Sequence, residues 1–444
     1  MQSKPQENAD ASCDVLVIGA GPAGSTVASL LADKGLSAVL LEKSHQLRFH
    51  IVESLLPANL PLFESMGIAD EVRAISMHKP GAEFVSMEHG RAQNFYFAEA
   101  RDKSMPHAYQ VRRADFDHLL FRCAQKKGAQ AHEGVKVTGA QFLPEGGAEV
   151  SAQDDEDQAL TWRARFVVDA SGRDTFLANR FRIKHRNPEH NSSAVYAHFD
   201  GAARGADSDQ GNISVFWSAH GWFWFIPLSD GTTSAGMLTW PNHMKFKGSR
   251  SLEQFLRDNI ATCPPLAKRL LAATQASPVQ ATGNFSYVSG RNHGKNHLML
   301  GHAYAFIDPV FSSGVWVAMH NAVVGVDAID TCLRDPARAR AAMRRFDRAV
   351  RHGPKVFSRF IYRVPNPIMR DFQMGPDNVL RVYAAILSVL AGDVFGETPI
   401  WRSLFAIKVI CRTANVFQTR RSFKACQQRR MNIRRVDDAA LYNA

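Results

Sequence analysis

The segment that most constrains the fold lies near the start of the chain, where closely spaced glycines follow a short apolar run. Asp14–Ile18 has the continuous apolar character of a central parallel strand. In the glycine run that follows, the first glycine suits a tight turn, the second lets the backbone approach a pyrophosphate, and the third lets a helix pack closely on the strand. We therefore predict a strand, a turn and a helix that bind a dinucleotide through Gly19, Gly21, Ala23 and Gly24.

A second apolar run, Ser37–Leu41, strengthens this interpretation because an acidic residue ends it. Glu42 is placed to accept a hydrogen bond from the ribose hydroxyl of an adenosine, and we take Lys43 as a further cofactor contact. The alternative for Glu42 is a surface carboxylate at a strand end.

An unusual aromatic stretch occupies the middle of the chain, Gly221–Pro227. If it is a strand, alternation places Trp222, Trp224 and Ile226 on one face and the intervening phenylalanines on the other. Pro227 would end the strand because proline cannot donate to a ladder. The alternative is an aromatic strand that is buried on both faces and serves packing alone.

Length and composition narrow the class of protein. A chain of 444 residues with 45% hydrophobic and 21% charged residues has room for two joined subdomains of ordinary globular character. The six cysteines include no Cys-x-x-Cys pair, so we predict neither a metal site nor a disulfide framework. The apolar run Val382–Ala391 is too short to cross a bilayer and the N-terminus is polar, so we expect a cytoplasmic protein.

The formal net charge of +11 points to an acidic partner, whether nucleic acid, an anionic membrane or an acidic protein. Basic residues gather near the end of the chain, although a solvated helix face is the usual meaning of such a run. They are Arg412, Arg420, Arg421, Lys424, Arg429, Arg430, Arg434 and Arg435.

Two spaced motifs resemble the signatures of the flavin-dependent halogenases. One is Trp222-x-Trp224-x-Ile226-Pro227, and the other runs from Phe306 to Gly314 as Phe-x-Asp-Pro-x-Phe-Ser-x-Gly. The similarity extends from about Asp14 to about Phe395. Within this two-component FAD-dependent monooxygenase superfamily, the sequence resembles the phenol and pyrrole branch. The reason is Phe311, which stands where the tryptophan branch carries glutamate.

The resemblance implies an α/β fold in which an FAD-binding Rossmann-like domain of the GR2 type carries an inserted antiparallel substrate layer and a helical C-terminal part. On this basis we assign 1–12 to a flexible leader, 13–180 with 285–335 to the FAD-binding domain, 181–284 to the substrate domain, and 336–444 to a basic helical region.

The resemblance also implies site residues. The tryptophans, Ile226 and Pro227 would shield the flavin from the organic substrate, and the backbone N–H groups of Ser313 and Gly314 would hold chloride or bromide. Further cofactor contacts would come from Arg113, Asp169, Gly301, His302, Asp308 and Ser312. An arginine at a helix start is more often solvated than bound, and the serines and glycine would equally cap an ordinary core helix.

Lys79 is the candidate catalytic residue, because Met77–Phe84 follows the Glu53–Pro57 segment at the family's distance. In that family reduced FAD from a separate reductase reacts with O₂ and halide, and the resulting hypohalous acid passes to a lysine. A lysine can polarise hypohalous acid or become a haloamine, and the pKa of a buried lysine shifts readily. The alternative is a solvated loop lysine beside a proline.

Three positions depart from the family pattern: His302 replaces an aspartate, and Ala305 and Val52 replace glycines. A β-branched residue at Val52 would be strained if the backbone there needs a positive φ. These departures suggest weak FAD binding or a catalytically silent relative.

The leading hypothesis is halogenation of a phenol or pyrrole in secondary-metabolite or pigment biosynthesis, on a substrate that is free or tethered to an acyl carrier protein. The basic C-terminal region would dock that acidic carrier protein by electrostatic attraction. An anionic membrane surface would explain the same charges. We expect no nucleic-acid partner. Two alternatives stay open: a hydroxylating monooxygenase or isoprenoid reductase of the same fold, and a non-catalytic flavoprotein scaffold.

Overall fold

The computed structural model describes residues 11–45, 52–187, 191–283, 286–361, 370–371, 374–375 and 382–395, with the isolated positions 423, 424, 427 and 431. Most of the proposed leader and all arginines of the basic C-terminal cluster lie outside these residues. The first strand, β1, spans Ala11–Ile18 and so includes the last two residues assigned to the leader, because Ala11 and Ser12 pair with β10.

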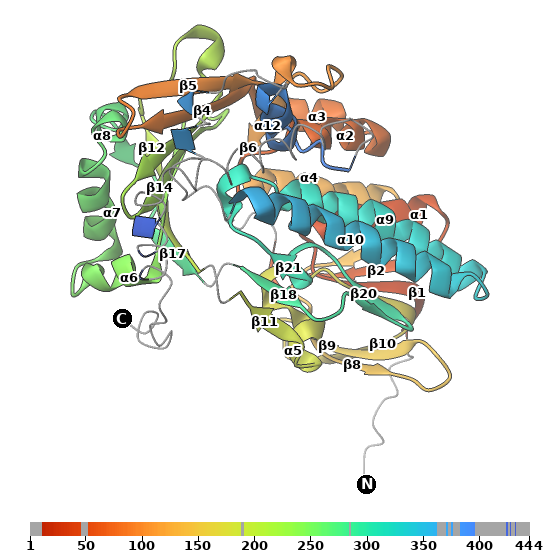
Figure 1. Ribbon diagram of the computed structural model, residues 1–444. Coiled ribbons are helices and arrows are strands. Elements are labelled where there is room, and N and C mark those ends of the chain that lie inside the picture. Colours follow the sequence, from red (N-terminus) through yellow and green to blue (C-terminus); the bar gives the residue numbers. More distant parts are fainter. Residues whose placement is uncertain are drawn as a thin grey trace.

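A mainly parallel sheet forms the centre of the FAD-binding half (Figure 1), with the strand order β19-β20-β10-β1-β2-β7. The apolar run predicted as a central strand is β1, which pairs in parallel with a strand on each side and is buried from Val15 to Ile18. These strands are β2 (Ala38–Leu41), β7 (Gln130–His132), β10 (Ala159–Asp169), β19 (His293–Gly294) and β20 (His297–Met299). The hairpin of β8 (Lys136–Phe142) and β9 (Ala148–Gln153) extends from β10.

Helices stack in layers over one face of this sheet (Figure 1). The predicted helix after the glycine turn is α1 (Pro22–Asp33), and it packs between α4 (Arg113–Lys126) and α9 (Gly314–Arg334). The outer layer is α10 (Ala339–Ile361), whose buried Met343, Phe346 and Val350 join the core of this half.

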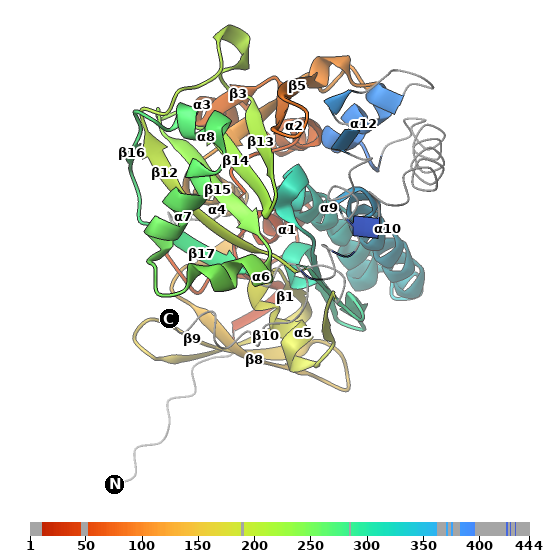
Figure 2. The same cartoon turned by 60° about the vertical axis from the view of Figure 1, so that its left-hand side comes forward.

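The substrate sheet is mainly antiparallel, as expected, and lies beside the FAD-binding half (Figure 2). Its order is β16-β12-β15-β14-β13-β4-β5, with β17 also paired to β12. Its strands are β12 (Ser193–Asp200), β13 (Ile213–Ser218), β14 (Gly221–Pro227), β15 (Thr233–Thr239), β16 (Thr274–Gln275) and β17 (Gln280–Gly283).

Two strands of this sheet come from the earlier part of the chain. They are β4 (Gly81–Ser86) and β5 (Arg91–Tyr96), and β4 pairs in parallel with β13. The substrate layer is therefore wider than the range 181–284, because hydrogen bonds recruit a hairpin that lies inside the range assigned to the FAD-binding domain. A crossover of this kind leaves no local mark in the sequence.

The alternation predicted for β14 is confirmed. Trp222, Trp224 and Ile226 lie in the apolar cluster shared with α12 (Val382–Leu390), whereas Phe223 and Phe225 face the cluster that includes α7 (Leu252–Ala261). Figure 1 shows α7 and α12 on opposite sides of the sheet. Both faces of β14 are consequently buried, and they contact different parts of the molecule.

A two-stranded sheet of β3 (Ser76–Lys79) and β6 (Ala108–Val111) joins the two halves. A second small sheet contains β11 (Lys184–Arg186), β18 (Tyr287–Ser289) and β21 (Ala305–Phe306). The remaining helices are α2 (Leu60–Met66), α3 (Ala69–Ile75), α5 (Phe176–Arg180), α6 (Pro241–Met244) and α8 (Pro264–Arg269). Among the described helices, none combines the length and apolar character needed to cross a bilayer.

Candidate active site

A cavity of about 730 Å³ opens at the carboxyl ends of β1 and β2, where ligands bind in sheets of this kind. Eight of the predicted cofactor and halide residues line it: Gly19, Gly21, Ala23, Glu42, Lys43, Arg113, His302 and Gly314. They reach it from the start of α1, the end of β2, the start of α4, the turn Gly301–Ala303 and the start of α9. The structure therefore brings together residues that are separated by almost three hundred positions.

Each glycine of the first turn is required for a different structural reason. Gly19 has a φ of 94°, and a Cβ there would lie 2.7 Å from the carbonyl oxygen of Ala170. A Cβ on Gly24 would lie 1.8 Å from the carbonyl oxygen of Gly19, so α1 could not pack as it does. A Cβ on Gly21 would meet no atom within 4 Å, which leaves its backbone open to the cavity. This cradle fits a pyrophosphate at the N-terminus of α1.

Glu42 is not a surface carboxylate, since only 2% of it is exposed. Its Oε2 accepts a hydrogen bond from the Ala20 amide at 2.8 Å, and its Oε1 accepts from the Ser44 amide at 3.1 Å. The side chain thus holds the glycine turn while it borders the cavity. Nearby, Lys43 forms an ion pair with Asp174.

Arg113 stands at the strand–helix junction, as predicted, and is not solvated. Its Nη2 contacts Asp117 Oδ2 at 2.8 Å, one helical turn along α4. The aspartate fixes the guanidinium at the edge of the cavity.

The other predicted cofactor and halide residues lie behind the cavity lining. Asp169 is fully buried, its carboxylate accepts from the amides of Ser171 at 3.0 Å and Leu177 at 2.7 Å, and burial raises its pKa. Asp308 accepts from the Val310 amide at 3.1 Å. The turn that Asp169 holds continues into Ala170, Ser171 and Gly172, which line the cavity. Gly301, Ser312 and Ser313 are likewise buried and are not among the lining residues.

His302 lies in the turn Gly301–Ala303 and lines the cavity beside Gly314, the first residue of α9. Its ring stacks on Phe306 with centroids 4.0 Å apart, and a Cβ on Gly314 would lie 3.1 Å from its Nε2. Burial lowers the pKa of His302 to about 3, with Arg113 and Arg173 acting in the same direction. The imidazole is therefore neutral at physiological pH and offers one donor and one acceptor nitrogen to a bound ligand.

The other two departures from the family pattern, Val52 and Ala305, differ in backbone strain. Val52 borders the cavity with a φ of 75°, so the expectation of strain at this β-branched residue is confirmed. Ala305 lies in β21 and is absent from the positive-φ residues, so its side chain is accommodated without strain.

Lys79 lies in a buried, largely apolar site at the end of β3. Only 2% of it is exposed, and its Nζ donates to Ser54 Oγ and to the Leu55 carbonyl oxygen, both at 2.9 Å. The ammonium also lies 5.1 Å from the centroid of the Phe97 ring. Burial lowers the pKa of Lys79 to about 7. The alternative of a solvated loop lysine is wrong, because the strand pairing draws Lys79 inward.

The apolar cluster that contains Trp222 and Trp224 reaches the cavity through Tyr196. The rings of Trp222 and Trp224 have centroids 5.9 Å apart, and Trp224 Nε1 donates to Ser234 Oγ at 3.3 Å. Tyr196, which lines the cavity, lies 5.9 Å from Trp224. A Cβ on Gly236 would lie 2.5 Å from the Trp224 ring, so this glycine provides the space for the indole.

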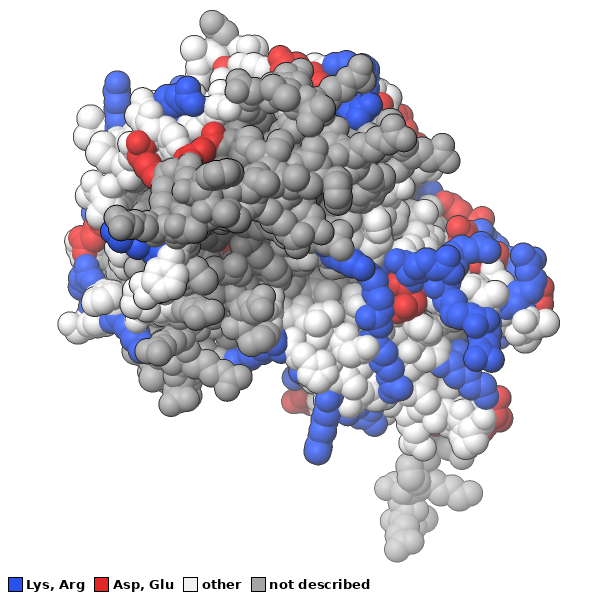
Figure 3. All heavy atoms as spheres, in the orientation of Figure 1, with Lys and Arg blue, Asp and Glu red and all other residues white. Residues whose placement is uncertain are grey.

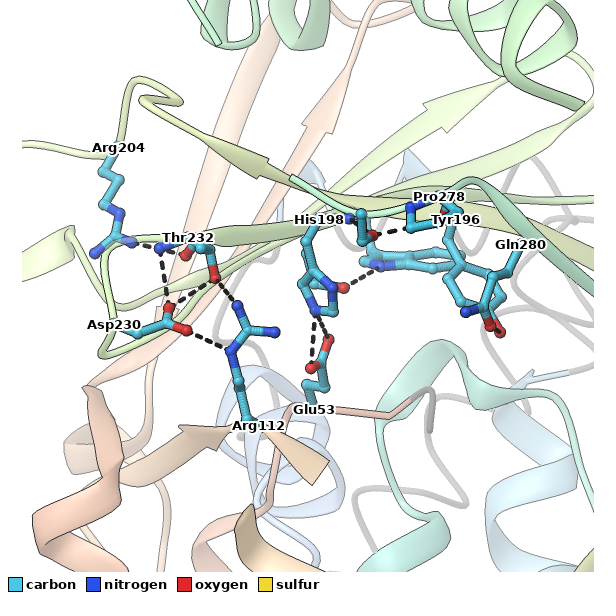
Figure 4. Close-up of polar contacts among 12 residues, drawn as sticks. Glu53, Arg112, Tyr196, His198, Arg204, Asp230, Thr232, Pro278 and Gln280 are labelled. Atoms are coloured by element: carbon cyan, nitrogen blue, oxygen red, sulfur yellow. Dashed lines mark hydrogen bonds and ion pairs between the residues drawn. The ribbon is translucent and has the colours of Figure 1, made fainter. Parts of the chain in front are cut away.

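The sequence analysis missed a buried pair that joins the two halves. His198 Nε2 contacts both carboxylate oxygens of Glu53, at 3.0 and 3.1 Å, and each residue is 2% exposed (Figure 4). Glu53 belongs to a motif that was recognised, and His198 shares a strand face with Tyr196. Only the pairing of distant segments could reveal their contact. The described residues contain no His, Cys, Asp and Glu group suited to a metal ion.

Comparison with known proteins agrees with this geometry. A family model described as an FAD binding domain matches residues 12–343. A 1H-pyrrole-2-carbonyl peptidyl-carrier-protein brominase of Pseudoalteromonas luteoviolacea is 32% identical over 334 residues, which cover 72% of this chain and 77% of the relative. The chain belongs to the flavin-dependent halogenases.

Two further relatives support this membership. A 1H-pyrrole-2-carbonyl peptidyl-carrier-protein chlorinase of Pseudomonas fluorescens is 28% identical to this halogenase, over 86% of the chain and 89% of the relative. The solved structure of the myxobacterial chondrochloren halogenase CndH has a TM-score of 0.76 and 30% identity, and covers 88% of this chain and 93% of its own. The cofactor of this halogenase is FAD, and the glycine cradle fits its pyrophosphate.

Proposed function

We propose that this halogenase chlorinates or brominates a pyrrole or phenol ring. The observation that carries the proposal is Lys79, a buried ammonium whose pKa is lowered to about 7. Its Nζ lies 5.1 Å from the centroid of the Phe97 ring, and Phe97 is a member of the apolar cluster that contains Trp222 and Trp224. Such rings are electron-rich, as electrophilic halogenation requires. The names of the relatives from Pseudomonas and Pseudoalteromonas support a pyrrole as the first substrate to test.

FAD, bound at the glycine cradle and reduced by a separate reductase, would supply two of the four electrons that reduce O₂, and halide would give the other two and become hypohalous acid. Ser313 and Gly314 begin α9, where backbone N–H groups favour a halide, and Gly314 faces the cavity. Trp222, Trp224, Ile226 and Pro227 keep the organic substrate from the flavin side. Lys79 receives the hypohalous acid and presents the halogen to the ring.

A substrate tethered to a carrier protein is supported by the relatives' names and by the positive charge of this chain. Figure 3 shows Lys and Arg gathered where Figure 1 places α10. The exposed arginines of that helix are Arg340, Arg344, Arg345, Arg348 and Arg351. Carrier proteins are acidic, so such a surface favours docking by electrostatic steering. The C-terminal arginines first expected to do this lie outside the described residues.

The test supplies reduced FAD from an NADH-dependent reductase, with bromide or chloride, to free and carrier-bound pyrrole-2-carboxylate and to phenols. Mass spectrometry should detect replacement of hydrogen by halogen only when halide is present. Lys79→Met should lower the rate by roughly 10²-fold or more, whereas the exposed Lys295→Met should match the parent. A hydroxylated product that forms without halide would establish the hydroxylase alternative instead.

Carrier docking is tested separately. Substitution of Arg420, Arg421, Arg429 and Arg430 by Glu should raise the KM for tethered substrate and leave that for free substrate unchanged. A second variant, in which Glu replaces Arg344, Arg345 and Arg348, tests whether α10 contributes to carrier docking. Unchanged KM values in both variants would refute docking through these charges.

A further inference from the structure

The buried pair of Glu53 and His198 has no part in the halogen transfer described above. His198 extends from β12 of the substrate sheet, and Glu53 from the segment that follows the cavity-lining Val52 (Figure 4). Removing a carboxylate from water costs several kcal/mol, and the imidazole must supply much of the compensation. Buried pairs are often replaceable by apolar side chains without loss of stability. Stability alone therefore does not explain why Glu53 and His198 are paired at this position.

Glu53 lies in a short segment, Val52–Leu55, that we call the strap. Backbone hydrogen bonds attach the strap to β6, from the Val111 amide to the Glu53 carbonyl oxygen at 2.8 Å and from the Leu55 amide to the Tyr109 carbonyl oxygen at 2.9 Å. The strap supplies both hydrogen-bond acceptors of Lys79. Its position therefore decides where the ammonium lies.

The strap begins under strain. The positive φ of Val52 costs on the order of 1–3 kcal/mol, which the surrounding contacts must offset. Glu53 is the next residue, and its side chain connects the strap to the substrate sheet. Without that connection, Val52 could relax towards a negative φ and displace Ser54 and Leu55. The contact between Glu53 and His198 thus lies between a strained residue and the acceptors of the catalytic lysine.

We propose that Glu53 and His198 are a positioning pair for Lys79. Their contact ties the strap to the substrate sheet and so keeps Ser54 Oγ and the Leu55 carbonyl oxygen on Lys79 Nζ. The consequence for catalysis rests on the proposed role of Lys79, but the effect on the strap does not. The pair also places β12, and therefore the substrate face, in a fixed relation to the lysine.

The primary test measures the reactivity of Lys79 itself. The purified protein is treated with acetic anhydride at pH 6, and peptide mass spectrometry compares acetylation of Lys79 with that of exposed Lys295. The hydrogen bonds to the strap favour the ammonium form, so their loss lowers the Lys79 pKa further and increases the neutral, reactive fraction. Glu53→Ala and His198→Ala should raise the relative rate about fivefold, as expected for a lost hydrogen bond.

Conservative variants separate positioning from simple destabilisation. Glu53→Gln and His198→Gln keep a hydrogen-bonding side chain and should restore the labelling rate to near that of the parent. Because a single alanine could unfold the protein, the double variant Glu53→Met with His198→Leu provides an apolar replacement of similar volume that removes both polar groups. It should fold and still show the increased labelling of Lys79.

A second contact between the two halves supplies the matched control. Arg112, which precedes α4, pairs with Asp230 in the turn between β14 and β15 (Figure 4). Asp230→Asn weakens this contact without touching the strap, so labelling of Lys79 should stay at the parent rate. In an active parent, Glu53→Ala should also lower kcat, and Asp230→Asn should not.

Unchanged Lys79 labelling in folded Glu53 and His198 variants would overturn the positioning role. Equal changes in the Asp230 variant would overturn it too, since the effect would then be general loosening. Absence of halogenation by the parent would instead refute the proposed function and leave the labelling comparison intact.

Discussion

The two halves of the site hold their functional groups by opposite means. The FAD cavity is formed where side chains are missing, at Gly19, Gly21 and Gly24. The buried carboxylates beside it, Glu42 and Asp169, accept hydrogen bonds from backbone amides. The substrate half is filled by large aromatic side chains around one buried cation with two acceptors. At Gly19 and Gly24 the packed backbone leaves no room for an added carbon, whereas a buried cation depends on contacts that side chains can lose.

The largest expected effect concerns the buried cation and stability against pH. Unfolded Lys79 has its ordinary pKa near 10.5, and the folded value is about 7. Between these values the unfolded chain binds more protons, so this residue makes stability rise with pH from about 7 to about 10.5 and is most destabilising below pH 7. Lys79→Met should remove that rise and stabilise the protein at pH 6 by several kcal/mol.

Urea unfolding at pH 6 and pH 9 measures this difference. Lys295→Met, which removes an exposed lysine, should leave the pH dependence of the parent in place. Equal pH dependence in the parent and in Lys79→Met would mean that Lys79 is solvated in the folded protein.

Gly24→Ala tests the backbone-shaped half. The new Cβ would lie 1.8 Å from the Gly19 carbonyl oxygen, so α1 and the glycine turn cannot both keep their positions. We expect a loss of about 3 kcal/mol of stability together with weaker FAD binding, measured by thermal unfolding and flavin fluorescence titration. Gly139→Ala in β8 is the matched control, because its Cβ would meet the nearest atom at 3.6 Å. Normal FAD affinity in Gly24→Ala would contradict the assigned role of the turn.

Gly236→Ala tests the aromatic half with the same single carbon. Its Cβ would lie 2.4 Å from the Cβ of Tyr196 and 2.5 Å from the ring of Trp224, so the indole must move. We expect about 2 kcal/mol of destabilisation. Because Trp224 is proposed to keep the substrate from the flavin, a larger share of reduced flavin should be lost to hydrogen peroxide. The fraction of reduced flavin lost to hydrogen peroxide is measured with an oxygen electrode, as the O₂ released when catalase is added. A peroxide yield equal to the parent's would show that Trp224 does not separate the two compartments.

The sequence could predict the features whose causes are local. The glycine turn, the alternation of β14 and the position of Arg113 each follow from residues close together in the chain. Pairings between distant segments were not predictable: β4 joins β13, and Glu53 meets His198 across 145 positions. The role of Asp169 and Asp308 at the cofactor stays a prediction from motifs, which could not show that their carboxylates accept hydrogen bonds from the amides of Ser171 and Val310.

The smallest expected effect lies where the two halves meet, at Val52. Glycine adopts a φ of 75° without the steric cost that valine meets, which would favour Val52→Gly by on the order of 1–3 kcal/mol. Glycine also increases the freedom of the unfolded chain by roughly 0.5–1 kcal/mol, so we expect a net gain of about 1 kcal/mol. Thermal unfolding measures this gain, and Val52→Ala, which keeps a Cβ, should gain less. Destabilisation by glycine would mean that contacts of the valine side chain outweigh its strain, and that the strap is held by packing as well as by Glu53.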